Sequence, residues 1–234
     1  MDSLLEIARG PLFRLSFAIL ILGLARLILL DVWGAYSAYR KAGDKEIPWK
    51  LLIRRGLEWL IPVKRVARNR PVYSIFSILF HVGLLIVPIF LFAHVQLWNQ
   101  SVGIAWFTIP YEAAQWLTIS TIVFAFALLI ARLFNITSSF ISRKQDYLWP
   151  VLLLLPFVSG FICAQMNVNA ETYRFFMLIH ILSGDLIFIL IPFTKIAHCV
   201  LMPMSQVICT LAWKFPPDTD DAVAITLNKK GVPV

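Results

Sequence analysis

The stretch from Thr172 to Pro203, TYRFFMLIHILSGDLIFILIPFTKIAHCVLMP, is apolar over most of its length and carries two histidines. His180 and His198 lie eighteen positions apart, which corresponds to about five turns of a straight helix and about 27 Å along its axis. The hydrocarbon core of a bilayer is about 30 Å thick. A continuous membrane helix would therefore place one imidazole near each membrane surface and both on one face. This geometry is suited to holding two haems, one above the other.

Composition places the chain among polytopic helical membrane proteins. Its 234 residues are 59% apolar and 15% charged, with a mean hydropathy of +0.78, which is more apolar surface than a soluble protein of this size can bury. We expect an all-α fold, with residues 1–204 as a membrane domain and residues 205–234 as a cytoplasmic tail. Apolar segments predict five spans, at residues 13–33, 73–97, 114–134, 148–165 and 173–200.

The net charge of +8 is distributed unevenly, which predicts an orientation. The connections after spans one and three are basic, whereas those after spans two and four nearly lack lysine and arginine. By the positive-inside tendency, the N-terminus lies outside and the C-terminus is cytoplasmic, in the inner membrane of the cell. Because most basic residues flank apolar spans, we expect contacts with membrane lipid and none with nucleic acid.

The connection from residue 38 to 70 is the most basic part of the chain. Within it, WKLLIRRGLEWLIPV (49–63) predicts an interfacial amphipathic helix with Trp49 and Trp59 as anchors. The same face could dock a partner subunit. Its ten basic residues are Arg40, Lys41, Lys45, Lys50, Arg54, Arg55, Lys64, Arg65, Arg68 and Arg70.

The cysteines exclude several cofactors on this chain. Cys163, Cys199 and Cys209 form no CxxC and no CxxCH pattern, which argues against an iron–sulfur cluster, a structural zinc site and a c-type haem. If the chain carries electrons, they must leave through clusters on another polypeptide.

All four histidines of the chain fall in spans two and five. Because the two spans run in opposite directions, His81 and His198 both lie toward the cytoplasm, and His94 and His180 both lie toward the outside. A single membrane histidine is as often a packing or hydrogen-bonding residue as a ligand. Two pairs at two depths instead predict two bis-histidine haems, with low-spin iron suited to electron transfer.

Span two poses a geometric problem for this pairing. His81 and His94 are thirteen positions apart, so on an ideal helix they point about 140° away from each other. A straight helix could not direct both toward span five. Pro88 between them predicts a kink, or else His94 lies where the helix ends.

Haem propionates require nearby cations. Lys195 and Arg26 are candidate partners on the inner side and Arg174 on the outer side, although each could equally be an interfacial side chain that reaches for water. Gly83 and Gly184 follow two of the histidines. Each could let a flat macrocycle approach the backbone or could serve tight helix packing.

These residues resemble a known family. FHVGLL (80–85), DYLWPVLLLLPFVSGF (146–161) and RFFMLIHILSGDLIFILIPFTKIAHCVLMP (174–203) are similar to the gamma subunit of respiratory nitrate reductase, a five-helix dihaem cytochrome b. The resemblance covers most of residues 15–204, and its most specific part is the run Pro192, Phe193, Thr194 and Lys195 before the last histidine. It implies that His81 and His198 bind the inner haem iron, and that His94 and His180 bind the outer one.

Two departures favour a related branch. The histidines of span two are more widely spaced here than in nitrate reductases, and Ala114 occupies the position of the lysine that those subunits place near the quinone. AHVQLW (93–98) followed by GIAW (103–106) looks more like the membrane subunit of the dissimilatory sulfite-reductase-associated electron-transport complex. That group is related to the cytochrome b of membrane-bound heterodisulfide reductase.

The resemblance implies two haem b groups and an exchange of electrons between a membrane quinone, such as menaquinone, and a cytoplasmic iron–sulfur subunit of the heterodisulfide-reductase kind. Further membrane or periplasmic redox subunits are also expected. Glu112, at the start of span three, is a candidate proton-exchanging group of the quinone site, although a first-turn acid is also favourable at any helix N-terminus. Alternatives from other classes are a proton or ion transporter with intramembrane histidines and a non-redox anchor.

Overall fold

The computed structural model describes residues 1–41, 49–50, 53–54, 70–165, 167–201, 205, 208 and 224–228. The regular structure of this part of the chain is helical, which confirms the all-α prediction. The predicted amphipathic helix at 49–63 and the tail at 205–234 lie almost wholly outside the described residues. Among the described residues, five helices are long and apolar enough to cross a membrane, namely Asp2–Arg40, Pro71–Phe90, Tyr111–Phe134, Lys144–Gln165 and Ala170–Phe193.

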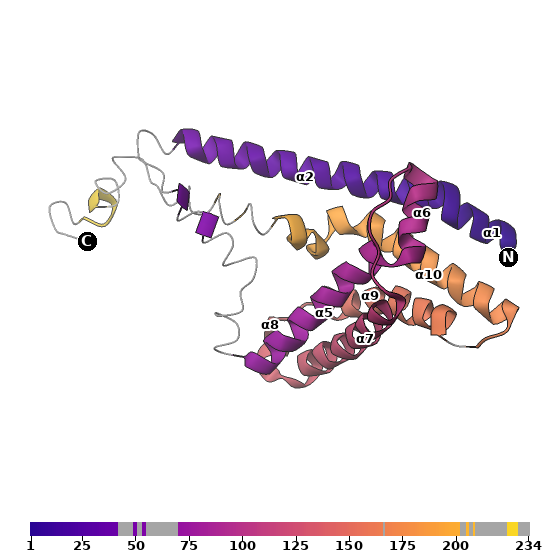
Figure 1. Ribbon diagram of the computed structural model, residues 1–234. Helices are drawn as coiled ribbons and strands as arrows, with labels where there is room; N and C mark the ends of the chain where they lie inside the picture. The colour runs from indigo at the N-terminus through magenta and orange to yellow at the C-terminus, as the bar shows by residue number, and fades with distance from the viewer. Residues whose placement is uncertain are drawn as a thin grey trace. The chain divides into compact units, whose positions relative to one another are not determined.

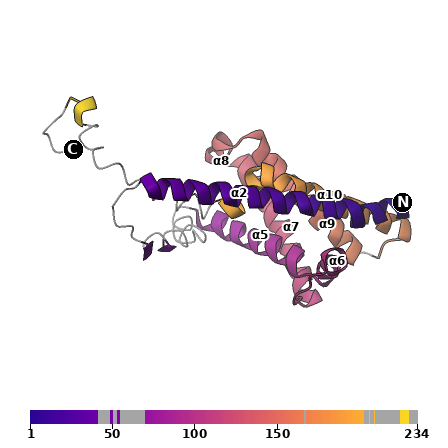
Figure 2. The ribbon, with the colours of Figure 1, turned by 90° about the horizontal axis from the view of Figure 1, so that it is seen from above.

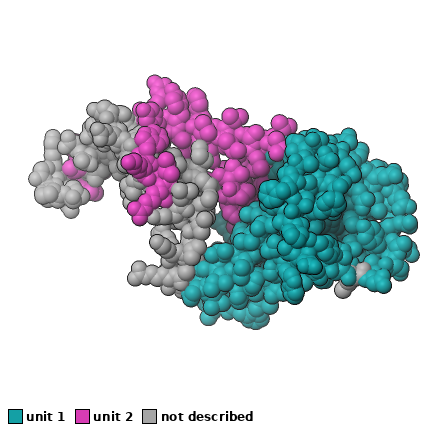
Figure 3. Space-filling model, in the orientation of Figure 1, with its two compact units in different colours: residues 1–20, 63–190 teal, residues 21–62, 191–234 magenta. Residues whose placement is uncertain are grey.

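The chain forms two compact units (Figure 3). The first comprises residues 1–20 and 63–190, and the second comprises residues 21–62 and 191–234. The division of the chain into a membrane domain at 1–204 and a separate tail stays a prediction.

The helices of the first unit pack in the order in which they follow one another. Helix α5 (Pro71–Phe90) packs on α7 (Tyr111–Phe134), α7 packs on α9 (Lys144–Gln165), and α9 packs on α10 (Ala170–Leu190) (Figures 1 and 2). Helix α10 is covered in turn by α1 (Asp2–Ile7) and the π-turn η1 (Ala8–Leu12), after which α2 (Phe13–Lys41) begins. In this order, α7 and α9 lie between α5 and α10.

Small residues allow the closest of these contacts. A Cβ atom on Gly83 of α5 would lie 2.9 Å from the Leu117 carbonyl oxygen and would collide with the Thr121 side chain of α7. Gly83 therefore serves tight helix packing, which was one of its two predicted roles. Gly184 differs, because a Cβ atom there would meet nothing within 4 Å.

The second span is interrupted, as the spacing of its histidines required. Helix α5 contains Pro88 and ends at Phe90, Leu91 is extended with φ −66° and ψ 132°, and α6 (Phe92–Val102) continues in a new direction (Figure 1). The carbonyl groups freed by the break find donors: the Trp106 indole nitrogen lies 2.8 Å from the Ile89 oxygen. The backbone nitrogen of Ile109 lies 3.0 Å from the Phe90 oxygen.

The fifth span is interrupted too, and here the sequence-based expectation of one straight helix through His180 and His198 is wrong. Helix α10 ends at Leu190 and is followed by two 3₁₀ turns, η2 (Ile191–Phe193) and η3 (Lys195–Ala197). Between them Thr194 is extended, with φ −135° and ψ 179°. Pro192 explains the change, because its ring cannot donate the backbone hydrogen bond that would continue the helix.

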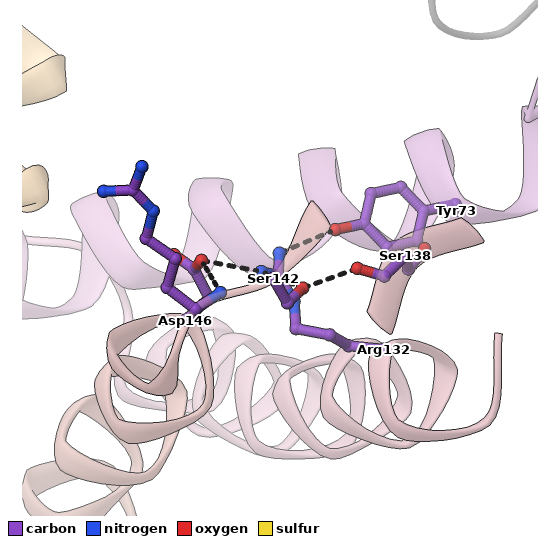
Figure 4. A network of polar contacts seen from close by, with 6 residues as sticks. Tyr73, Arg132, Ser138, Ser142 and Asp146 are labelled. Carbon is purple, nitrogen blue, oxygen red and sulfur yellow. Dashed lines mark hydrogen bonds and ion pairs between the residues drawn. The ribbon is translucent and has the colours of Figure 1, made fainter. Parts of the chain in front are cut away.

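Polar contacts hold together one end of α5, α7 and α9 (Figure 4). The Arg132 guanidinium of α7 lies 3.5 Å from the Tyr73 hydroxyl of α5, 3.3 Å from the Ser142 hydroxyl and 3.9 Å from an Asp146 carboxylate oxygen of α9. Between α7 and α9, α8 (Ile136–Ile141) is capped by the Asn135 side chain. Because this end is the predicted cytoplasmic one, the arginine lies where the positive-inside tendency expects it.

Candidate functional site

The structure brings together one of the two predicted histidine pairs. The imidazole of His94 on α6 and that of His180 on α10 have ring centres 5.8 Å apart and planes inclined by only 10°. Both side chains belong to the first compact unit. The break at Leu91 makes this possible, because it frees α6 from the direction of α5.

Each ring of this pair is tethered by its Nδ1 atom to a backbone carbonyl. His180 Nδ1 lies 2.7 Å from the Pro156 oxygen, and His94 Nδ1 lies 3.3 Å from the Val87 oxygen. A carbonyl oxygen only accepts, so Nδ1 carries the proton of the neutral imidazole and Nε2 carries the lone pair. Such tethers fix the tautomer and orientation of histidines that ligate metals.

A glycine makes room for the ring of His180. A Cβ atom on Gly160 of α9 would lie 2.8 Å from both Cε1 and Nδ1 of the His180 imidazole. Only a glycine at this position lets the ring lie against α9 and reach the Pro156 oxygen. Sequence reasoning did not identify Gly160, although it follows Pro156 by one helical turn in the quoted stretch 146–161.

His81 and His198 share the same kind of tether. His81 Nδ1 lies 2.6 Å from the Ser77 oxygen on α5, and His198 Nδ1 lies 2.8 Å from the Lys195 oxygen at the end of η3. All four histidines therefore have a backbone acceptor for Nδ1. His81 belongs to the first unit and His198 to the second, and their pairing stays a prediction.

The outer pair fits a haem by its chemistry and its spacing. A porphyrin supplies four nitrogen ligands to iron, and two imidazoles complete the coordination. Two metal–histidine bonds of about 2 Å each would place the ring centres roughly 6 Å apart. The observed 5.8 Å between the ring centres of His94 and His180 is close to that separation.

The other predicted site residues are exposed charged side chains. Arg174 forms an ion pair with Asp2, its Nε atom 3.1 Å from a carboxylate oxygen. Arg26 of α2 and Lys195 are exposed. Glu112 is exposed in the first turn of α7. Their roles as propionate partners and as a quinone-site group stay predictions.

An aromatic cluster, absent from the sequence-based prediction, follows the outer histidine by one helical turn. Trp98 of α6 meets Phe13 and Phe17 edge-on, with ring centres 5.4 and 4.6 Å away. It also lies 6.2 Å from the ring of Phe188 on α10 and 5.9 Å from that of Trp106. The cluster ties α6 to α2 and α10, and so helps to position His94. The spacing of four between His94 and Trp98 was the available signal.

A buried acid on α10 was also missed. Asp185 is 3% exposed and has one carboxyl oxygen 2.8 Å from the hydroxyl of Ser16, which is fully buried. Its other carboxyl oxygen is buried without a hydrogen-bond partner. The signal was a single acidic residue in the middle of an apolar span, which is costly unless it has a function.

The chain was compared with known proteins. No family model matches it, and no solved structure matches it. A protein of Nitratidesulfovibrio vulgaris (strain Hildenborough), known only as "Protein", is 30% identical over 155 residues, which cover 66% of this chain and 67% of the relative. The two chains belong to one family, and the name of the relative states no activity.

Proposed function

We propose that this chain is a dihaem b-type membrane subunit that transfers electrons between a membrane quinone and a cytoplasmic iron–sulfur subunit. The observation that supports this function best is the pair of parallel imidazoles of His94 and His180, 5.8 Å apart and each tethered through Nδ1. Without a function such as haem ligation, four histidines in apolar segments would be energetically unfavourable.

His94 and His180 would hold the outer haem through their Nε2 atoms. The Val87 and Pro156 carbonyls keep both rings in the tautomer that ligation needs. A bound haem supplies reversible one-electron chemistry. A haem held by two imidazoles would have no open position for oxygen, so these residues favour electron transfer over oxygen chemistry.

His81 and His198 would hold the inner haem. Each presents an Nε2 lone pair, because its Nδ1 lies within hydrogen-bonding distance of a carbonyl oxygen. The predicted orientation places both on the cytoplasmic side, where the basic connection at 38–70 would receive the iron–sulfur partner. Electrons would therefore cross the membrane between the two haems and leave through that partner.

We assign the chain to a sulfur-linked anaerobic respiratory complex, on the resemblance of AHVQLW (93–98) and GIAW (103–106) to the sulfite-reductase-associated membrane subunit. A nitrate reductase gamma subunit and a heterodisulfide reductase cytochrome b are the alternatives within this class. Menaquinone is the expected quinone, with Glu112 exchanging its protons.

The test is to count haems on the purified protein. A reduced-minus-oxidised absorbance spectrum in detergent should show b-type bands, and haem extraction should yield two haems per chain. A colourless protein, expressed with haem supplied, would contradict the proposal and favour a transporter that uses intramembrane histidines.

Single substitutions then test the pairing. His180→Ala should lose the outer haem and keep the inner one, whereas His198→Ala should lose the inner haem and keep the outer one. Each variant would hold one haem per chain, and the two remaining haems should differ in spectrum and midpoint potential. If either variant kept both haems, the ligand assignment would be wrong.

A further inference from the structure

The Ser16 hydroxyl has two oxygen atoms within hydrogen-bonding distance and only one hydrogen to donate. The Ser16 hydroxyl lies 2.9 Å from the Phe13 carbonyl oxygen and 2.8 Å from an Asp185 carboxyl oxygen. The hydroxyl carries one hydrogen, and the Phe13 carbonyl can only accept it. If Asp185 were ionised, both neighbours of the hydroxyl would be pure acceptors, and one short contact would have no hydrogen.

A proton on Asp185 resolves this conflict. The carboxylic acid then donates to the Ser16 oxygen, and the Ser16 hydroxyl donates to Phe13. The three groups are among the most buried of the chain, with Ser16 at 0%, Asp185 at 3% and Phe13 at 5% exposure. In such surroundings an ionised carboxylate with one unpartnered oxygen is far more costly than a neutral acid.

We propose that Asp185 and Ser16 form an intramembrane proton-binding site that is coupled to the charge of the His94–His180 pair. The coupling rests on the function proposed above. Asp185 carries this proton when a haem held by the pair is reduced, releases it when that haem loses one electron to the iron–sulfur partner, and takes up one proton when the quinol supplies the next electron. The charge of this region is thereby conserved over one cycle, and no bond other than the O–H bond is made or broken.

The position of Asp185 favours this coupling over a purely structural role. Asp185 follows His180 by five residues on α10, about 7.5 Å along the helix axis and about 140° around it. Because Asp185 is 3% exposed, water screens it little from a charge change at the pair. Its partner Ser16 lies on α2, next to Phe13, which contacts the aromatic cluster around Trp98.

The other ionisable groups on the elements packed around Asp185 are mostly exposed or lie at the far end of α9. Those of the N-terminal segment are exposed, and those at the start of α9 belong to the polar network at its other end. On the elements around Asp185 they are Asp2, Glu6, Arg9 and Arg14 before and in α2, Glu171, Arg174 and His180 on α10, His94 on α6, and Lys144, Asp146 and Cys163 on α9.

The proton itself can be observed by infrared spectroscopy of the purified full-length protein near neutral pH. The wild type, reduced with dithionite, should show a carbonyl-stretch band of a protonated carboxylic acid that shifts in D₂O. The band should be absent in Asp185→Asn and displaced in Ser16→Ala. It should be unchanged in Ser74→Ala, which removes another buried hydroxyl whose oxygen lies 2.8 Å from the Arg70 carbonyl. An identical spectrum in wild type and Asp185→Asn would overturn the proposal.

The coupling is tested by redox titration of the outer haem at several pH values. Because reduction is accompanied by proton uptake, its midpoint potential should fall as pH rises, by up to about 59 mV for each tenfold change in proton activity. In Asp185→Asn this slope should be lost, with Ser74→Ala behaving as wild type. Equal slopes in all three proteins would overturn the coupling. Under reducing conditions the infrared band does not require haem, so a protein with the band and without haem would contradict the proposed function alone.

Discussion

At the scale of single residues, the outer site depends on the absence of one methyl group. Gly160 leaves the space in which the His180 ring lies, and a Cβ atom there would approach that ring to 2.8 Å. We expect Gly160→Ala to displace the imidazole from the Pro156 carbonyl and from its position opposite His94. Haem content should fall from two toward one per chain, measured by extraction and by the reduced-minus-oxidised spectrum.

Gly10→Ala is the matched control for this change. It adds the same methyl group to η1, where a Cβ atom would meet nothing within 4 Å. Its haem content should equal that of the wild type. Full retention of both haems in Gly160→Ala would show that His180 does not need this space to bind.

At this scale the sequence predicted that histidines form the site and that His94 pairs with His180, but it did not predict the contacts that orient the rings. The depths of His94 and His180 follow from their places in two opposed apolar spans, and the structure confirms that their rings lie together. The Pro156 carbonyl that orients His180 could not be predicted. It comes from a neighbouring helix, and its position depends on how α9 and α10 pack.

At the scale of elements, the break at Leu91 is maintained by a side chain from the following loop. The Trp106 indole donates to the Ile89 oxygen at 2.8 Å, which the helix itself leaves without a partner. Trp106→Phe removes this hydrogen bond and should lower the free energy of unfolding by about 1 kcal/mol. The melting temperature in detergent should drop by about 2–4 °C.

The control for this substitution is Trp116→Phe. Trp116 lies on α7 and is 70% exposed, so the same chemical change should leave the melting temperature within error of the wild type. An equal drop in both variants would mean that the Trp106 contact contributes nothing particular to the break.

The contact of α5 with α7 should tolerate no added atom at Gly83. Its Cβ would meet Thr121 and the Leu117 carbonyl, and overpacking of this kind costs roughly 1–3 kcal/mol. We expect Gly83→Ala to unfold at lower temperature or denaturant concentration, and Thr121→Ala added to it to recover part of the loss. A double variant no more stable than Gly83→Ala would place the strain elsewhere.

Hydropathy predicted all five membrane helices but not their interruptions. Pro88 indicated a kink in span two, because His81 and His94 point in different directions on a straight helix. Pro192 equally indicated a break in span five, but the spacing of His180 and His198 favoured a straight helix instead. A spacing of eighteen residues suits a straight helix, and only the backbone reveals that α10 ends at Leu190.

At the scale of the whole molecule, the predicted orientation can be tested by labelling. In a background with the native cysteines changed to serine, Gln100→Cys at the end of α6 and Gln145→Cys at the start of α9 each give one exposed thiol. A membrane-impermeant maleimide should label position 100 in intact spheroplasts, and position 145 only after permeabilisation. The reverse pattern would invert the topology and exchange the inner and outer haems.

The single extended residue at Leu91 couples the length of one helix to the direction of the next. Helix α5 ends at Phe90 and α6 begins at Phe92, so the direction of α6, and of His94 on it, depends on where around its axis α5 ends. Each residue added to or removed from α5 would turn its end by about 100°, and His94 would turn with it. Relatives that fit α5 to a thicker or thinner membrane should therefore change its length by whole turns if they keep the same angle between imidazoles.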